Sequence, residues 1–303
     1  MPEKTGVSTK SRLDALYLEA DKICIGANSR IVLMSDCHRG VGNHGDNFLY
    51  NQNLAAAALS YYNRRQFTYV ELGDGDELWE NRKIEPVIRM HDDIFEILSH
   101  FYRQGRFIML YGNHDRKKEQ PRFMDRYYTH YYCENKDCYQ ELFPRLTAKE
   151  GLILEEAATG SRIFLVHGHQ GDLMNDTLWR LTCFLVRHVW RRFELWGVQD
   201  PTSAAKNYRR KKKTEKRLAS WAEENGVLLV AGHTHRPVLP KPGDSLYAND
   251  GSCVHPRSIT ALEIEGGYIT LVRWRTEVGK NNALYVGREV MEGPYRIADY
   301  FRM

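Results

Sequence analysis

Side chains that bind metals follow five apolar segments of the sequence. The five groups are Asp36-Cys37-His38, Gly73-Asp74, Gly112-Asn113-His114-Asp115, His167-Gly168-His169 and Gly232-His233-Thr234-His235. Carboxylate, amide and imidazole donors gathered at one point would repel one another or lose water unless a cation joined them. Mixed oxygen and nitrogen donors suit manganese, iron, zinc or nickel better than calcium. If the chain brings the five groups together, they form a metal centre.

The five apolar segments that precede these groups have the pattern of buried strands. They cover residues 30–34, 67–72, 106–111, 162–166 and 227–231. Near-continuous apolar character over five or six residues is typical of strands that are covered on both faces. Helical stretches at 51–63 and 86–102 separate the first three, and this alternation indicates a layered α/β fold. Parallel strands end at one edge of a sheet, so the five groups are expected to meet there.

The C-terminal part of the chain has a different pattern. Residues 261–265 and 268–272 are two apolar segments joined by Gly266-Gly267, which is typical of a β-hairpin. We expect this hairpin to belong to a second sheet that packs on the first, with helices outside. Residues 1–303 are expected to form a single domain.

Residues 173–225 are predicted to be a helical cap inserted into that domain. The cap begins with an apolar stripe at helical spacing, formed by Trp179, Cys183, Val186, Trp190 and Phe193. A basic run follows at 209–217. The stripe either packs against the main domain or a dimer mate, or it contacts a lipid surface. The basic run is either a solvated helix face, or it steers phosphate-bearing substrates or nucleic acid.

Two cations suit this donor set because one carboxylate can bridge a pair of ions. Hydrolytic two-metal sites hold their ions roughly 3.5–4 Å apart. We expect manganese first, with iron, zinc or nickel as alternatives. Each group alone is explained by a turn or a surface histidine. All five in order, each closing an apolar segment, indicate a hydrolytic centre.

The ordered set resembles the signature of the calcineurin-like metallophosphoesterase superfamily, which is D-x-H, G-D, G-N-H-D/E, H and G-H-x-H. The resemblance covers about residues 31–254. It implies a four-layer α/β/β/α sandwich with a dinuclear metal centre. The residues it implies for one metal are Asp36, His38 and His235, for the other Asn113, His167 and His233, and for the bridge between them Asp74.

The same resemblance implies that His114 faces the substrate and that Asp115 orients it, so these two are the expected catalytic residues. Water acidified by the cations would attack phosphorus, and His114 would donate a proton to the leaving oxygen. His167 is the preferred ligand over His169 because it directly follows the fourth strand. His169 either lies behind the ligands or contacts substrate, and Asp172 is a candidate to orient a ligand imidazole.

Within the superfamily, the chain is most similar to UDP-2,3-diacylglucosamine hydrolases. Residues 74–79 are similar to their D-x-x-E-x-W, residues 232–237 match their G-H-T-H-R-P, and the predicted cap corresponds in position to their helical lid. However, His114 replaces an arginine of that family, His169 replaces an acid, and Gly75-Asp76 replaces an apolar pair. The resemblance therefore extends to the scaffold and the metals more than to a lipid substrate.

The substrate is expected to be a phosphorylated small molecule or a lipid-linked compound. Arg39 and Arg236, each next to an expected ligand, are candidates to hold phosphate oxygens, with surface ion pairs as the alternative. Two other functions stay open: a polynucleotide or protein phosphoesterase, and a non-catalytic scaffold that keeps the fold.

The overall composition is that of a globular protein. The chain has 303 residues, of which 42% are hydrophobic and 27% charged, and its mean hydropathy is −0.56, which excludes a disordered chain and a polytopic membrane protein. A net charge of +4 is too balanced to predict nucleic-acid binding. Six scattered cysteines and a polar start over residues 1–10 lead us to expect a reduced, cytoplasmic protein.

Overall fold

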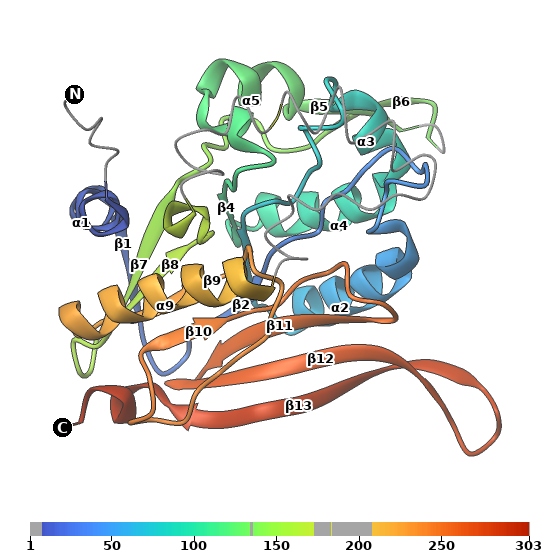
Figure 1. Ribbon diagram of the computed structural model, residues 1–303. Helices are drawn as coiled ribbons and strands as arrows, with labels where there is room; N and C mark the ends of the chain where they lie inside the picture. Colours follow the sequence, from blue (N-terminus) through green and yellow to red (C-terminus); the bar gives the residue numbers. More distant parts are fainter. Residues whose placement is uncertain (1–7, 134–135, 173–182, 184–207, 303) are drawn as a thin grey trace.

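The computed structural model describes residues 8–133, 136–172, 183 and 208–302 (Figure 1). Within these ranges the helices are α1 (Thr9–Glu19), α2 (Gln52–Arg64), α3 (Glu85–Met90), α4 (Asp92–Arg103), α5 (Pro121–Tyr127) and α9 (Tyr208–Asn225). The strands are β1 (Asp21–Ile25), β2 (Arg30–Met34), β3 (Thr68–Leu72), β4 (Phe107–Leu110), β5 (His130–Cys133), β6 (Cys138–Glu141), β7 (Gly151–Glu156), β8 (Arg162–Val166), β9 (Leu228–Ala231), β10 (Tyr247–Asn249), β11 (Ser258–Glu265), β12 (Tyr268–Val278) and β13 (Leu284–Arg296).

Two sheets face each other. The larger sheet has the strand order β13-β12-β11-β2-β3-β4, in which β2, β3 and β4 are parallel and the C-terminal strands are antiparallel. The smaller sheet has the order β1-β7-β8-β9-β10, in which β8, β9 and β10 are parallel. Strands β5 and β6 form a separate hairpin.

Three apolar cores hold the layers together. The core between the sheets contains Leu33 and Leu72 from the larger sheet and Leu165 and Val230 from the smaller one. A second core lies between the larger sheet and helices α2 and α4. A third lies between the smaller sheet and helices α1 and α9, where Trp221 packs on Phe164 (Figure 1). The order of layers is therefore α/β/β/α, which confirms the predicted sandwich.

The predicted strands correspond to β2, β3, β4, β8 and β9, and the helix expected at 51–63 is α2. The stretch expected as one helix at 86–102 is two helices, α3 and α4, with His91 between them. His91 is buried, and its ring contacts Asp46 at 2.9 Å and Gln52 at 2.9 Å. Its backbone lies outside the helical region, with φ −119° and ψ 35°, so the helix is interrupted there.

The placement predicted for the hairpin was wrong. Strands β11 and β12 do not build a second sheet, because β11 pairs with β2 in the larger one. Ala261 of β11 faces the helix side and Leu262 faces the inter-sheet core, so β11 extends both faces of β2. The second sheet is formed instead by strands from the middle of the chain, together with β1.

Most of the cap predicted at 173–225 lies outside the described residues; the structure describes Cys183 and α9 of it. Among the helices that it describes, none is both long enough and apolar enough to cross a bilayer.

Candidate metal centre

The five chemical groups come from the ends of strands in both sheets. Asp36, Asp74 and Asn113 follow β2, β3 and β4 of the larger sheet, whereas His167 and the 233–235 loop follow β8 and β9 of the smaller one. Backbone hydrogen bonds join adjacent loops: Asp36 N–H donates to Gly73 C=O at 3.1 Å, and Gly232 N–H donates to His167 C=O at 2.9 Å. The centre therefore lies where the two sheets end together.

The backbone at the expected ligands is strained. Five of the seven expected ligands have φ angles in the left-handed region. These angles are 51° at Asp36, 48° at His38, 51° at Asp74, 64° at His233 and 53° at His235. Residues other than glycine rarely adopt this conformation, and each instance costs on the order of 1–3 kcal/mol. Five of the ten non-glycine residues with a positive φ among the described residues are expected ligands, which indicates that these loops are shaped for the site.

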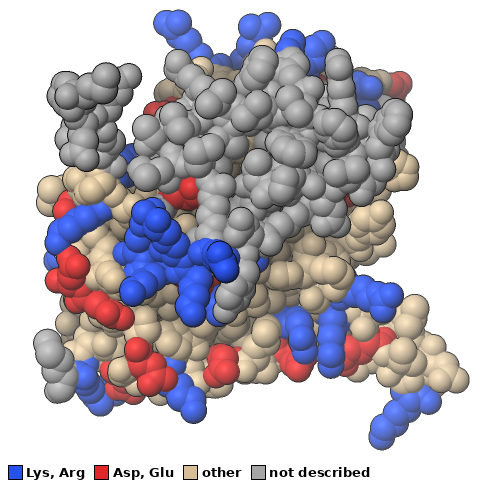
Figure 2. Space-filling view, in the orientation of Figure 1, with Lys and Arg blue, Asp and Glu red and all other residues tan. Residues whose placement is uncertain are grey.

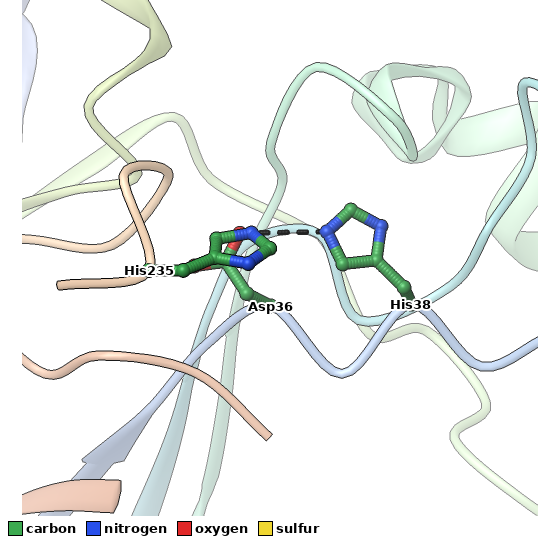
Figure 3. A group of neighbouring side chains, drawn as sticks. All are labelled: Asp36, His38 and His235. Atoms are coloured by element: carbon green, nitrogen blue, oxygen red, sulfur yellow. Dashed lines mark ion pairs between the residues drawn. The ribbon is translucent and has the colours of Figure 1, made fainter. Parts of the chain in front are cut away.

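One donor group contains Asp36, His38 and His235 (Figure 3). Its ligand atoms all lie within 4.8 Å of one another, with His235 Nε2 at 3.0 Å and His38 Nε2 at 3.6 Å from Asp36 Oδ1. The other carboxylate oxygen, Oδ2, accepts hydrogen bonds from Ser35 Oγ at 2.6 Å and from His233 N–H at 2.8 Å. The carboxylate is thus fixed with Oδ1 directed between the two imidazoles.

The second donor group contains Asp74, His167 and His233. Leu72 C=O lies 3.0 Å from His167 Nδ1, which orients the opposite nitrogen, Nε2, toward Asp74 Oδ2 at 3.0 Å. The same Oδ2 lies 3.9 Å from His38 Nε2 of the first group. Asp74 is therefore the carboxylate that lies between the two donor groups.

Asn113 and Asp172 complete the surroundings of the second group. Asn113 is buried, and neither of its amide atoms has a hydrogen-bond partner among the described residues. A buried amide without partners costs free energy unless something else binds it. Asp172 Oδ2 lies 3.8 Å from His233 Nε2.

Imidazoles lie against the two buried carboxylates and offset the cost of their burial. Burial raises the pKa of Asp36 and Asp74, but neighbouring imidazoles, His235 for Asp36 and His167 for both, lower it well below the usual range. Burial lowers the pKa of His167, but Asp74 and Asp36 raise it to about 9. A metal ligand must be deprotonated, so cations would displace the His167 proton and take over its charge. The donors fit a pair of divalent cations.

A network of buried charges lies under the ligand loops. The Lys118 ammonium contacts Asp115 Oδ2 at 2.7 Å, Asp76 Oδ2 at 2.8 Å and Glu71 Oε1 at 3.2 Å. Arg39 contacts Glu71 at 2.7 Å and Asp76 at 2.7 Å. The Arg39 side chain is 1% exposed. It therefore forms buried ion pairs, and not the phosphate contact that was expected of it.

Asp115 anchors two ligand loops within this network. Its Oδ1 accepts a hydrogen bond from Gly112 N–H at 2.7 Å, and its Oδ2 accepts one from Gly75 N–H at 3.0 Å. Burial raises the pKa of Asp115, opposed by the Lys118 ammonium. Asp115 thus positions the turns that carry Asp74 and Asn113. It was expected to orient His114, but another carboxylate lies beside the His114 ring.

Glu77 is that carboxylate, and it was not among the predicted site residues. Its Oε2 lies 2.7 Å from His114 Nδ1 and 3.1 Å from His38 Nδ1. Burial raises the pKa of Glu77, but the two imidazoles lower it to about 2. Trp79 stacks on the His114 ring at 4.1 Å between centroids. The sequence feature that could have identified Glu77 is its position three residues after Asp74.

The two remaining predicted residues, His169 and Arg236, differ in their burial. His169 is fully buried, its Nε2 lies 3.8 Å from Glu150 Oε1, and its ring centroid is 5.7 Å from that of His167. Arg236 is half-exposed and pairs with Glu215. His169 therefore lies behind His167, and Arg236 lies at the rim.

Two adjacent donor groups, with the Asp74 carboxylate between them, suit the pair of closely spaced ions found in two-metal hydrolases. A family model described as calcineurin-like phosphoesterase matches residues 29–237. The chain belongs to this family.

Comparison with curated proteins gives no match. The solved structures similar to the chain include the following two. Vacuolar protein sorting 29 from Cryptosporidium parvum is 14% identical, with 88% of this chain and 98% of that one covered and a TM-score of 0.37. Vps29 from Chaetomium thermophilum is 11% identical, with 87% and 95% covered and a TM-score of 0.37. Neither alignment bears on function.

Gly112→Ala is expected to disrupt the metal centre. A Cβ atom at this position would lie 2.2 Å from Asp74 Oδ1 and 2.7 Å from His167 Cδ2, so both donors must move. We expect fewer than two metal ions per chain by elemental analysis. Gly26→Ala is the control, because its Cβ would have no neighbour within 4 Å. Full loading of Gly112→Ala would contradict the arrangement described.

Lys118→Met is expected to destabilise the fold. Removing the ammonium leaves Asp115, Asp76 and Glu71 with too little positive charge, a loss of roughly 3–5 kcal/mol in the free energy of unfolding. Urea denaturation measures this quantity. Lys136→Met is the control, since Lys136 and Glu96 form an exposed pair whose loss changes stability little. Similar losses in both variants would argue against the network.

Proposed function

We propose that this protein is a dinuclear metal-dependent phosphohydrolase that cleaves a phosphoester or pyrophosphate bond with water. The observation that carries the proposal is the pair of donor groups, Asp36-His38-His235 and Asp74-His167-His233, each with its ligand atoms within 4.8 Å. Membership of the calcineurin-like phosphoesterase family supports metal-dependent phosphoester hydrolysis. We also propose that the substrate is a phosphorylated small molecule or a lipid-linked compound and that the protein is cytoplasmic. Within the family, we propose that it is most similar to UDP-2,3-diacylglucosamine hydrolases.

The residues proposed to hold one cation are Asp36, His38 and His235, and those for the other are Asn113, His167 and His233, with Asp74 shared. Bound cations of this kind acidify water and neutralise the charge that develops on phosphoryl oxygens. The chain's part is to fix the donors. Asp36 Oδ2 and Asp74 Oδ1 are each held by a backbone N–H, from His233 and His114 respectively, both at 2.8 Å, which leaves one oxygen of each carboxylate for the cations.

His114 is the proposed proton donor to the leaving oxygen. Glu77 at 2.7 Å from Nδ1 and the Trp79 ring against its face fix the imidazole in one orientation. Burial lowers the pKa of His114, but Glu77 and Asp74 raise it above its ordinary value, which favours the protonated form. With Nδ1 turned to Glu77, Nε2 is the nitrogen that can reach substrate.

The complete donor set favours hydrolysis over a non-catalytic scaffold. The direct test is hydrolysis of p-nitrophenyl phosphate and bis-p-nitrophenyl phosphate, with and without added manganese. We expect metal-dependent release of p-nitrophenol from at least one of them. Inactivity on both, together with no metal bound after loading, would favour the scaffold.

His114→Ala is expected to keep two metals per chain but to reduce kcat by about 10²–10⁴-fold, the range typical for loss of a general acid. Metal content is measured by elemental analysis and kcat on whichever ester the wild type hydrolyses. His130→Ala is the matched control because His130 is exposed in β5. An unchanged kcat in His114→Ala would remove its assigned role.

Asp74→Ala is expected to reduce both metal content and turnover, because the shared carboxylate organises both donor groups. Elemental analysis should find fewer than two ions per chain. The exposed Asp244 provides the control, Asp244→Ala, which should load as the wild type does. Two ions bound to the Asp74→Ala variant would contradict the bridging assignment.

A further inference from the structure

Strands β12 and β13 continue past the rest of the larger sheet as a two-stranded arm, residues 276–286. Strand β11 begins at Ser258, opposite Arg275 of β12, and does not reach the arm, whereas β12 and β13 pair as far as Val278 and Leu284. Figure 1 shows the arm projecting from the body of the molecule. A two-stranded ribbon is only marginally stable in water, and further strands or a packing partner stabilise it.

Exposed apolar side chains concentrate in and beside this arm. Of the eleven large apolar side chains that are exposed among the described residues, five lie between 278 and 291. They are Val278, Leu284, Tyr285, Val290 and Met291. In Figure 2 the arm is a projection of mostly uncharged atoms at the lower right. Single exposed apolar residues are ordinary, whereas a group of them in one place marks an interaction surface.

Three of these residues share one face of the ribbon. Val278 lies opposite Leu284, and Val290 lies an even number of residues further along β13, so the alternation of a strand places all three on the same side. Charged residues of the other face pair within the chain: Arg275 Nε lies 3.5 Å from Glu289 Oε2. The exposed apolar side chains, and not the charged ones, are therefore what a partner would cover.

The outer edge of β13 is open over the first half of the strand. β13 is the outermost strand of the larger sheet, and β12 is the one described strand that pairs with it. Natural edge strands are protected by lysines, prolines or bulges. In β13 the register with β12 shifts after Val290, and Pro294 follows. Residues 284–290 contain no lysine, proline or register shift, so another strand can pair with them.

The segment 284–290 is complementary to the same segment of a second copy. In an antiparallel pair about a two-fold axis, the residue on the axis lies opposite itself. An axis at Arg288 or Glu289 would place like charges opposite each other, which is unfavourable. An axis further along in either direction would run into the turn at 279–283 or the register shift in β13. An axis at Gly287 avoids both. The opposed residues are then Leu284 with Val290, Tyr285 with Glu289, and Val286 with Arg288.

We propose that a second copy of this chain pairs antiparallel with residues 284–290 of β13, so that the two larger sheets form one continuous sheet in a homodimer. The two-stranded arm of each copy then gains strands from the other. Leu284 of each copy packs beside Val290 of the other, which removes exposed apolar surface on both sides of the axis. The dimer does not depend on metal binding, because none of the residues 284–290 is an expected ligand.

Sedimentation velocity of the full chain over a series of micromolar concentrations tests the dimer. We expect a monomer–dimer equilibrium in the wild type. Leu284→Lys/Val290→Lys places like charges opposite each other at two points of the paired segment, and it should raise the dimer dissociation constant by about 10-fold. Leu18→Lys is the control, because Leu18 is 84% exposed in α1, and it should leave the dissociation constant unchanged.

A second double variant, Leu284→Lys/Val290→Glu, tests the register. With the axis at Gly287, its opposite charges face each other across the two copies, so it should dimerise more tightly than Leu284→Lys/Val290→Lys. Both substituted side chains are exposed, and circular dichroism checks that each variant is folded.

A wild type that is monomeric at every concentration would overturn the dimer, as would equal dissociation constants in the two double variants. Binding of a monomeric wild type to vesicles of anionic phospholipid, lost in Leu284→Lys/Val290→Lys, would assign the arm to a membrane surface and overturn the dimer as well.

Discussion

The structure depends on burying two carboxylates, Asp36 and Asp74, at the junction of two sheets. Negative charge at such a place is costly unless positive charge offsets it. In this chain imidazoles surround both groups, and His167 stands between them, with its Nε2 3.9 Å from Asp36 Oδ1 and 3.0 Å from Asp74 Oδ2. The left-handed backbone at Asp36 and Asp74 and the side-chain-free position at Gly112 follow from the same requirement, since donors must approach one another more closely than ordinary loops allow.

The charges beneath the site explain how the loops keep this geometry. Three carboxylates, Glu71, Asp76 and Asp115, share the cations of Arg39 and Lys118 in the interior. Asp115 also binds the backbone of the two turns that present Asp74 and Asn113. A site that holds cations in place needs ligands that do not relax when they approach, and an ion network behind the turns provides that rigidity.

Much of this arrangement could be predicted from the sequence, because an apolar strand followed by a metal-binding side chain is a local pattern. The strands β2, β3, β4, β8 and β9 were predictable in this way, whereas the four-layer order was predicted from the resemblance to the metallophosphoesterases. Partners that depend on packing between distant segments were not: the pairing of β11 with β2, the burial of Arg39, and the contact of Glu77 with both His38 and His114. Lys118 is adjacent to other charged residues, and nothing in its sequence context marks it as buried. The cap assigned to 173–225 remains a prediction.

Each donor group takes side chains from both sheets: Asp36 and His38 with His235 in one, and Asp74 with His167 and His233 in the other. Metal coordination would therefore join the two sheets at the end of the sandwich where the loops meet. The opposite end, which is away from these ligands, would then be where the sheets separate first in local opening. The exchange rate of the strand amide hydrogens would accordingly increase with distance from the metal centre.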